Sequence, residues 1–129
     1  MQVRQKPLDQ QTLVITGATS GIGLATAKRA AADGAAVVLA ARSREALDKV
    51  VDEITAKGGR ATAIVADVGD EEQVQAVADH AIATFGGFDT WINDAGVGVY
   101  SELMDLPSDE HQRLFQTNYW GVVFGSRAA

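Results

Sequence analysis

The chain has 129 residues, which is enough for one domain with a single hydrophobic core and does not favour two domains. With 47% hydrophobic and 22% charged residues, its composition is that of a globular protein and excludes a disordered chain. The net charge of −6 disfavours sequence-independent binding to nucleic acid or to anionic membranes, although it leaves room for a local basic site. Cysteine is absent, which excludes disulfides and thiolate chemistry and favours a cytoplasmic location.

Short apolar runs alternate with amphipathic stretches along the chain. The runs are typical of parallel strands that are covered on both faces, and they lie at residues 13–15, 36–40, 61–66 and 88–93. A helix is predicted after each of them. Ser43 and the Asp70–Gln73 pair are expected to cap the second and third helices, and Ser108 the last one, which follows a loop over residues 94–107.

This order of elements predicts an α/β fold with a doubly wound parallel sheet, strand order 3-2-1-4 and helices on both faces. Residues 1–10 are predicted to be an N-terminal tail, and residues 11–129 to form the domain. The helical pattern of residues 121–129 is not followed by a residue that closes a helix. We therefore hypothesise that the chain is the N-terminal part of a longer protein, truncated before further elements.

The sequence Thr-Gly-Ala-Thr-Ser-Gly-Ile-Gly, residues 16–23, lies between the first predicted strand and the first helix. Gly17 permits a sharp turn off the strand, Gly21 lets the backbone approach a diphosphate, and Gly23 allows the helix to pack closely on the strand. Free N–H groups at the start of the helix, together with its dipole, then bind the anion. The other residues expected to contact this ligand are Thr19, Ser20 and Ile22. The alternative is a plain strand-to-helix turn.

The G-x-x-x-G-x-G spacing of this turn, with its leading Thr16, resembles the short-chain dehydrogenase/reductase family in its classical form. The resemblance covers about residues 10–129. At the end of the third predicted strand, Asp67 and Val68 resemble the pair that contacts adenine in the family. The resemblance implies a Rossmann-like domain over residues 11–129 that binds a nicotinamide dinucleotide.

Two further motifs agree with this family. The sequence Asn-Asp-Ala-Gly follows the fourth predicted strand and resembles the family's Asn-Asn-Ala-Gly signature, with Asn93, Ala95 and Gly96 as the matching residues. In the last helix, Asn118 matches the asparagine of the family's catalytic tetrad, which helps to hold a water in a proton relay to a catalytic lysine. Because Asn118 lies on the apolar row of its helix, we expect it to need buried hydrogen-bond partners.

The second predicted strand ends in Ala41-Arg42-Ser43, at the point where an acidic side chain would select NAD by binding the ribose 2′-OH. No carboxylate occupies this place. The guanidinium of Arg42 and the hydroxyl of Ser43 suit a 2′-phosphate instead, so the sequence predicts NADP in preference to NAD. A solvated surface arginine is the alternative.

Asp94 departs from the family signature, because an ionised carboxylate only accepts hydrogen bonds where asparagine both donates and accepts. A backbone N–H or a cation could meet this carboxylate, and otherwise burial would raise its pKa. The sequence leaves both alternatives open. It predicts no metal site, since the two histidines, His80 and His111, stand on different predicted helices.

The family's Tyr-x-x-x-Lys pair is absent from these residues. Tyr100 is followed four residues later by Met104, and Tyr119 by Val123. We interpret the chain as the N-terminal part of an NADP-dependent oxidoreductase that transfers hydride between nicotinamide and a carbonyl or alcohol substrate. The alternative is a non-catalytic module that binds a nucleotide or dimerises. The resemblance also implies a small-molecule substrate and a homo-oligomer, with no nucleic acid or membrane partner.

Overall fold

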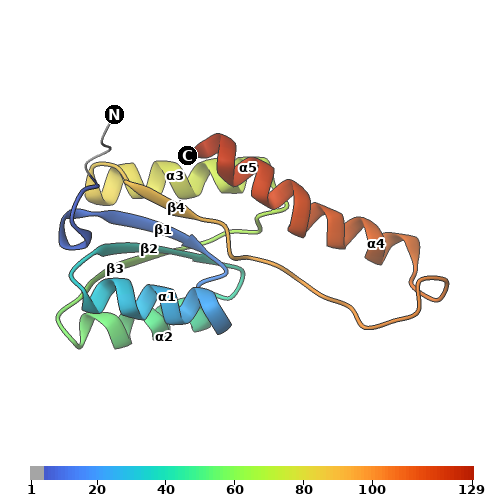
Figure 1. Cartoon of the computed structure of the whole chain (residues 1–129), viewed down its shortest axis with the longest axis horizontal. Coiled ribbons are helices and arrows are strands. Elements are labelled where there is room, and N and C mark those ends of the chain that lie inside the picture. Colours follow the sequence, from blue (N-terminus) through green and yellow to red (C-terminus); the bar gives the residue numbers. More distant parts are fainter. Residues whose placement is uncertain (1–4) are drawn as a thin grey trace.

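The computed structural model describes residues 5–129. Its four parallel strands form one sheet in the order β3-β2-β1-β4, as predicted (Figure 1). The strands are β1 (Thr12–Thr16), β2 (Ala36–Ala41), β3 (Arg60–Val65) and β4 (Thr90–Ile92). The helices are α1 (Gly21–Ala32), α2 (Arg44–Thr55), α3 (Glu71–Phe85), α4 (Ser108–Phe115) and α5 (Gly121–Ala128). The short turns are η1 (Leu8–Gln10) and the π-helical η2 (Gln116–Trp120), which lies between α4 and α5.

Helices cover both faces of the sheet, with α1 and α2 on one face and α3 and α5 on the other (Figure 1). Successive side chains of a strand point to opposite faces. Ile15 and Leu39 accordingly pack with α1 and α2, whereas Val14 and Val38 pack with α3. All four are fully buried. The two-sided cover explains why the strands are continuous apolar runs rather than alternating ones.

Two of the predicted helix caps are confirmed. The hydroxyl of Ser43 accepts a hydrogen bond from the N–H of Ala46, at 3.3 Å. One carboxylate oxygen of Asp70 accepts from the N–H groups of Glu72 and Gln73, at 3.0 and 3.2 Å, and the amide of Gln73 donates to the other oxygen at 2.9 Å. These bonds, with that of the Gln73 side chain the strongest, lower the pKa of Asp70. The cap therefore has its full strength when Asp70 is ionised.

The prediction that Ser108 caps the last helix is wrong. Ser108 is already the first residue of α4, and the capping position is held by Pro107, whose backbone is extended. Proline has no side-chain acceptor, so this end has no side-chain cap. The preceding residues, 94–107, form the predicted loop, which extends beyond the carboxyl ends of the strands before the chain returns through α4 (Figure 1).

The N-terminal residues lie at the end of the sheet where β1 and β4 begin. Lys6 forms an ion pair with Asp89 at 2.9 Å, and the same carboxylate accepts the N–H of Thr12 at 2.8 Å. Leu8, in η1, packs against the core between the sheet and α1. The tail predicted for residues 1–10 also includes residues 1–4, which lie outside the described residues. Within residues 5–129, no helix combines the length and the apolar character needed to cross a bilayer.

The cap of α3 leads to a prediction for stability and pH. Asp70→Ala is expected to lower the melting temperature at pH 7, since two helical N–H groups lose their acceptor. The folded-state pKa of Asp70 is lowered, so the stabilisation is complete above its unfolded-state pKa of about 4 and is lost as the pH falls through the folded-state value. The difference from the unsubstituted protein should therefore shrink below about pH 4.

Thermal unfolding followed by circular dichroism at pH 7 and in acid measures this effect. Asp70→Asn is the matched control, because asparagine caps as well as aspartate and does not titrate. Equal melting temperatures for Asp70→Ala and the unsubstituted chain at pH 7 would show that the cap does not stabilise the fold.

Candidate functional site

The glycine-rich turn joins the end of β1 to the start of α1. Gly17 has φ +67° and Gly21 has φ +53°, a conformation that glycine adopts without the steric cost of a Cβ. A Cβ on Gly17 would lie 2.8 Å from both the N and the Cα of Ala95, which belongs to the turn after β4. The two turns therefore touch through their backbones, and a side chain at position 17 would separate them.

Gly23 has the role in close packing that the sequence predicts. It is buried, and a Cβ at this position would collide with the carbonyl oxygen of Gly17 and lie 2.7 Å from Oδ2 of Asp94. The first turn of α1 thus packs directly on the residues that precede it. The carboxylate of Asp94 reaches this turn from the end of β4, so an acidic side chain lies beside the start of the helix.

A single hydroxyl group links the two turns. Thr16 is only 2% exposed, and its Oγ1 accepts hydrogen bonds from the N–H groups of Asp94 and Ala95, each at 3.2 Å. The same hydroxyl donates to the carbonyl of Ile92 at 3.4 Å. Its hydrogen-bonding capacity is thereby used within the fold. Thr16 fixes the position of the turn after β4 relative to the glycine-rich turn.

A cavity of about 230 Å³ opens at the carboxyl ends of the strands. Its walls come from the glycine-rich turn, the ends of β2 and β3, the turn after β4 and the π-helical η2. The residues that line it are Gly17, Thr19, Ser20, Ala40, Ala41, Arg42, Ser43, Ala66, Asp67, Val68, Ala95, Gly96, Val97 and Thr117. Nine of the residues singled out from the sequence are in this set, so motifs spread over 80 positions meet around one space.

The wall at the end of β2 is basic, whereas the wall at the end of β3 holds a tethered carboxylate. Arg42 is exposed, and no ion pair among residues 5–129 includes it. Asp67 accepts the N–H of Gly69 at 2.9 Å through one oxygen and meets the guanidinium of Arg113 at 3.2 Å through the other. The orientation of Asp67 is therefore set by its own loop and by α4.

Asn118 lies next to the cavity and not in its lining. Its amide pairs with one peptide unit: Oδ1 accepts the N–H of Val97 and Nδ2 donates to the Val97 carbonyl, both at 2.8 Å. The expectation of buried partners is corrected here, because Asn118 is exposed. The peptide of Val97 belongs to the loop over residues 94–107. Asn118 fastens the start of that loop to η2.

Asn93, Gly21, Ile22 and Gly23 are also outside the lining of the cavity. Asn93 faces α5: its Oδ1 accepts the indole N–H of Trp91 at 2.9 Å, and its Nδ2 donates to the hydroxyl of Ser126 at 3.4 Å. A Cβ on Gly125 would collide with this Oδ1. In this structure Asn93 joins β4 to α5.

Sequence reasoning did not identify Thr117 and Val97 as lining residues, nor Thr16 as the link between the turns. Thr117 is 6% exposed, a rare burial for a polar side chain, and it directly precedes Asn118. In the sequence, the signal for Thr117 was its position directly before Asn118, which matches the family's tetrad asparagine. The role of Thr16 depends on contacts with residues 76 or more positions away, which no local pattern contains.

Residues 5–129 hold no group of three or more acidic, cysteine or histidine side chains placed to bind a metal ion. His80 contacts the hydroxyl of Thr62 at 2.9 Å and thereby joins α3 to β3.

A parallel sheet whose first strand leads through a glycine-rich turn into a helix, with a cavity at the carboxyl ends of the strands, defines a nucleotide-binding α/β domain. The family model of the short chain dehydrogenases matches residues 11–129. The chain belongs to this family.

Relatives and solved structures agree with the assignment. The chain is 51% identical over 128 residues to the uncharacterized oxidoreductase YxnA of Bacillus subtilis (strain 168), covering 99% of this chain and 36% of that protein. A short chain dehydrogenase/reductase from Burkholderia phymatum, in complex with NAD, has a TM-score of 0.93 and 36% identity, covering 96% of this chain and 44% of the other.

L-Sorbose reductase from Gluconobacter frateurii, complexed with NADPH and L-sorbose, has a TM-score of 0.86 and 34% identity, covering 92% of this chain and 45% of the other. The chain thus spans less than half the length of each of these three proteins. The two structures contain different cofactors, so the fold is compatible with either one.

Gly23→Ala tests the close approach in the turn. The added Cβ would meet the backbone of Gly17, which cannot move without displacing the turn. We therefore expect any binding of NADH or NADPH to weaken at least about tenfold and stability to fall by roughly 1–3 kcal/mol. Gly98→Ala is the control, because a Cβ there meets nothing within 4 Å. The measurements are fluorescence titrations with NADH and with NADPH, and thermal unfolding. Unchanged affinity in Gly23→Ala would contradict the role of the turn.

Proposed function

We propose that these residues form the cofactor-binding part of an NADP-dependent short-chain oxidoreductase that acts on a carbonyl or alcohol substrate. Membership of the family supports NAD or NADP as the ligand class. The observation that supports NADP is the end of β2, where Arg42 lines the cavity beside Ser43 and no carboxylate is present. We propose both which residues bind the cofactor and that they prefer NADP to NAD.

The glycine-rich turn fits a diphosphate. Gly21, where a Cβ would meet nothing within 4 Å, leaves no side chain between the ligand and the backbone, while the close contacts of Gly17 and Gly23 with the protein keep the turn in this shape. No acidic residue lies in the first turn of α1, and the capping position, Ser20, makes no side-chain bond to the helix. The first N–H groups of the helix are therefore left for an anion, and Thr19, Ser20, Gly21 and Ile22 are the residues that would surround it.

At the adenosine end, Arg42 would meet the 2′-phosphate with a charged, forked donor, while the hydroxyl of Ser43 caps α2 and keeps its hydrogen for a second bond. Asp67 and Val68 would flank the adenine, with the carboxylate held in place by Gly69 and Arg113. The wall at the end of β2 would distinguish the two cofactors, since only NADP carries a 2′-phosphate that can form a charged pair with the guanidinium.

At the other end, Ala95 and Gly96 would face the nicotinamide half, on the turn that Thr16 positions. The bound dinucleotide would supply hydride chemistry at this end of the cavity. Asn93 and Asn118 would hold the surrounding segments, through α5 and through the peptide of Val97. We assign Asn118 to the catalytic side of the site because it matches the tetrad position and lies at this end.

These residues would bind and orient the dinucleotide without transferring the proton. Reduction of a carbonyl needs an acid within hydrogen-bond reach of the developing alkoxide. Neither Tyr100 nor Tyr119 has a lysine four residues later, so neither forms the pair that the family uses. We therefore assign proton transfer to a Tyr-x-x-x-Lys segment of a longer protein, and with it most of the contacts that select the substrate.

We further propose that the protein is a cytoplasmic homo-oligomer. The absence of cysteine supports the reducing compartment. Phe115, Tyr119, Trp120 and Val122 are exposed along the helical segment from α4 to α5, and a cluster of large apolar side chains of this kind is typical of an interface.

Arg42→Ala tests the cofactor preference. Loss of a charged hydrogen bond to the 2′-phosphate should weaken NADPH about 10- to 100-fold and leave the affinity for NADH within about twofold. Arg44→Ala is the matched control, since Arg44 lies two residues further on, pairs with Asp48 at 3.7 Å and does not line the cavity. Calorimetric titration of both cofactors against the three proteins measures these affinities. Equal losses for NADPH and NADH would show that Arg42 does not bind the 2′-phosphate.

A further inference from the structure

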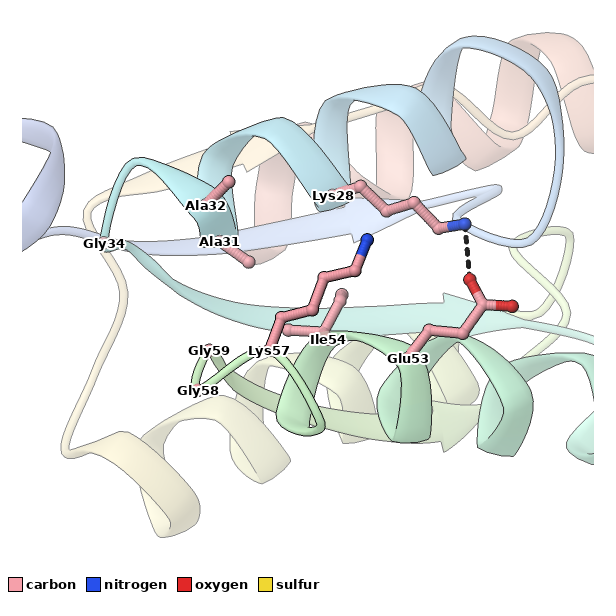
Figure 2. A pocket seen from close by; sticks show the side chains of 9 residues that line it. All are labelled: Lys28, Ala31, Ala32, Gly34, Glu53, Ile54, Lys57, Gly58 and Gly59. Carbon is pink, nitrogen blue, oxygen red and sulfur yellow. Dashed lines mark ion pairs between the residues drawn. The ribbon is translucent and has the colours of Figure 1, made fainter.

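A second cavity, of about 260 Å³, lies between the C-terminal ends of α1 and α2 (Figure 2). It is bordered by Gly34, shortly before β2, and by Gly59, immediately before β3. Because β2 and β3 are parallel, this places it at the amino ends of the strands, whereas the proposed cofactor cavity is at their carboxyl ends. The two cavities share no lining residue.

The floor of the second cavity is apolar. Ala31 of α1 and Ile54 of α2 are 7% and 4% exposed and come from the two helices that form its sides (Figure 2). A Cβ on Gly59 would lie 2.6 Å from Cγ2 of Ile54, so a side chain at position 59 would compete with Ile54 for this space. Small residues thus keep the cavity open above a methyl-lined floor.

The rim of the cavity carries two ammonium groups and one carboxylate. Nζ of Lys28 meets Oε2 of Glu53 at 2.5 Å, across the gap between α1 and α2. Lys57 extends toward the same space (Figure 2), and no ion pair among residues 5–129 includes it. The Lys28 hydrogen bond and charge lower the pKa of Glu53, and Lys49 and Lys57 lower it further. Among the lining residues, one carboxylate thus stands against the two lysines Lys28 and Lys57, so the charges of the lining sum to a positive value in a chain whose net charge is −6.

Hydrogen bonds within the fold reduce the negative charge that the carbonyl groups at the helix ends present to this cavity. Carbonyls at a helix C-terminus repel anions when they are free. Here the carbonyl of Ala31 accepts the N–H of Gly34 at 3.1 Å, and that of Ile54 accepts the N–H of Gly59 at 3.0 Å. Arg60 donates to the carbonyl of Gly34 at 3.1 Å, which adds another cation near the rim. The lysine ammonium groups are left as the donors that a ligand can use.

We propose that this cavity is a binding site for a small organic carboxylate, with the acid group on Lys57 and Lys28 and a short apolar body on Ala31 and Ile54. The volume lies below the range of about 300–1,000 Å³ that is usual for drug-sized ligands, so the ligand is a compact one. The floor favours an organic acid over inorganic phosphate. The apolar body of an organic acid leaves water when it binds on the floor, which is favourable, and phosphate has no such body. The positive rim selects an acid over a neutral molecule of the same shape.

Titration of the isotope-labelled full chain with sodium benzoate, followed by amide NMR at constant ionic strength, tests the proposal. We expect saturable shifts at Ala31, Ile54 and Gly59. Lys57→Gln should weaken benzoate about three- to fivefold, whereas Lys49→Gln should change its affinity by less than about 1.5-fold. Lys49 is an exposed lysine on the same helix that does not line the cavity, so the two variants lose the same charge. Thermal unfolding in benzoate provides a second readout, because a ligand of the native state raises the melting temperature.

Benzyl alcohol and inorganic phosphate separate the two parts of the proposal. Both should bind more weakly than benzoate, since the first lacks the charge and the second the apolar body. The proposal is overturned if benzoate gives no saturable shifts at these residues, or if the two lysine variants lose affinity equally. Phosphate binding as tightly as benzoate would overturn the assignment to an organic acid, and benzyl alcohol binding as tightly would overturn the role of the lysines.

Discussion

The candidate site depends on the contact between two backbone turns at the carboxyl ends of β1 and β4. The hydroxyl of Thr16 holds the N–H groups of Asp94 and Ala95, and Gly17 approaches Ala95 so closely that a Cβ would not fit. In the part of the chain that the structure describes, β4 has three residues and pairs with β1 alone, so its few ladder bonds give little support to the turn after it. The turn that carries Ala95 and Gly96 is therefore positioned mainly by Thr16 and Gly17.

Asp94 connects this contact to the charge of the site. Its backbone N–H is used by Thr16, while its carboxylate reaches Gly23 at the beginning of α1. A negative side chain near a helix N-terminus interacts favourably with the helix dipole. The same charge lies near the place proposed for the diphosphate, so it opposes an anionic ligand there. Asp94, the residue that departs from the family signature, therefore affects the first turn of α1 and does not line the cavity.

The architecture was predictable because local and long-range signals agree. Short stretches of sequence are enough to recognise the apolar runs, the caps at Ser43 and Asp70, and the glycine-rich turn. The strand order then follows from the rules for parallel crossover connections. The family motifs gave most of the cavity lining. Ser108 was misassigned because a one-residue difference in where a helix begins decides which residue is the cap.

The remaining features depend on contacts that the sequence pattern does not contain. The π-helical turn η2 interrupts a helix whose apolar spacing continues without a break, and it is where Asn118 pairs with Val97. Asn93 was grouped with the site by its motif, yet its side chain joins Trp91 and Ser126, and the fit depends on the absence of a side chain at Gly125. To predict either role, one must know which segment of the chain packs against the asparagine: the loop at Val97 for Asn118, and α5 at Ser126 for Asn93.

The most direct test of the account is the crystal structure of the chain grown with NADPH. The proposed site predicts the diphosphate at the first turn of α1 beside Gly17 and Gly23, the adenine between Asp67 and the end of β2, and the 2′-phosphate within hydrogen-bond reach of Arg42. A dinucleotide bound elsewhere on the molecule, or one whose 2′-phosphate points away from Arg42 into solvent, would contradict it.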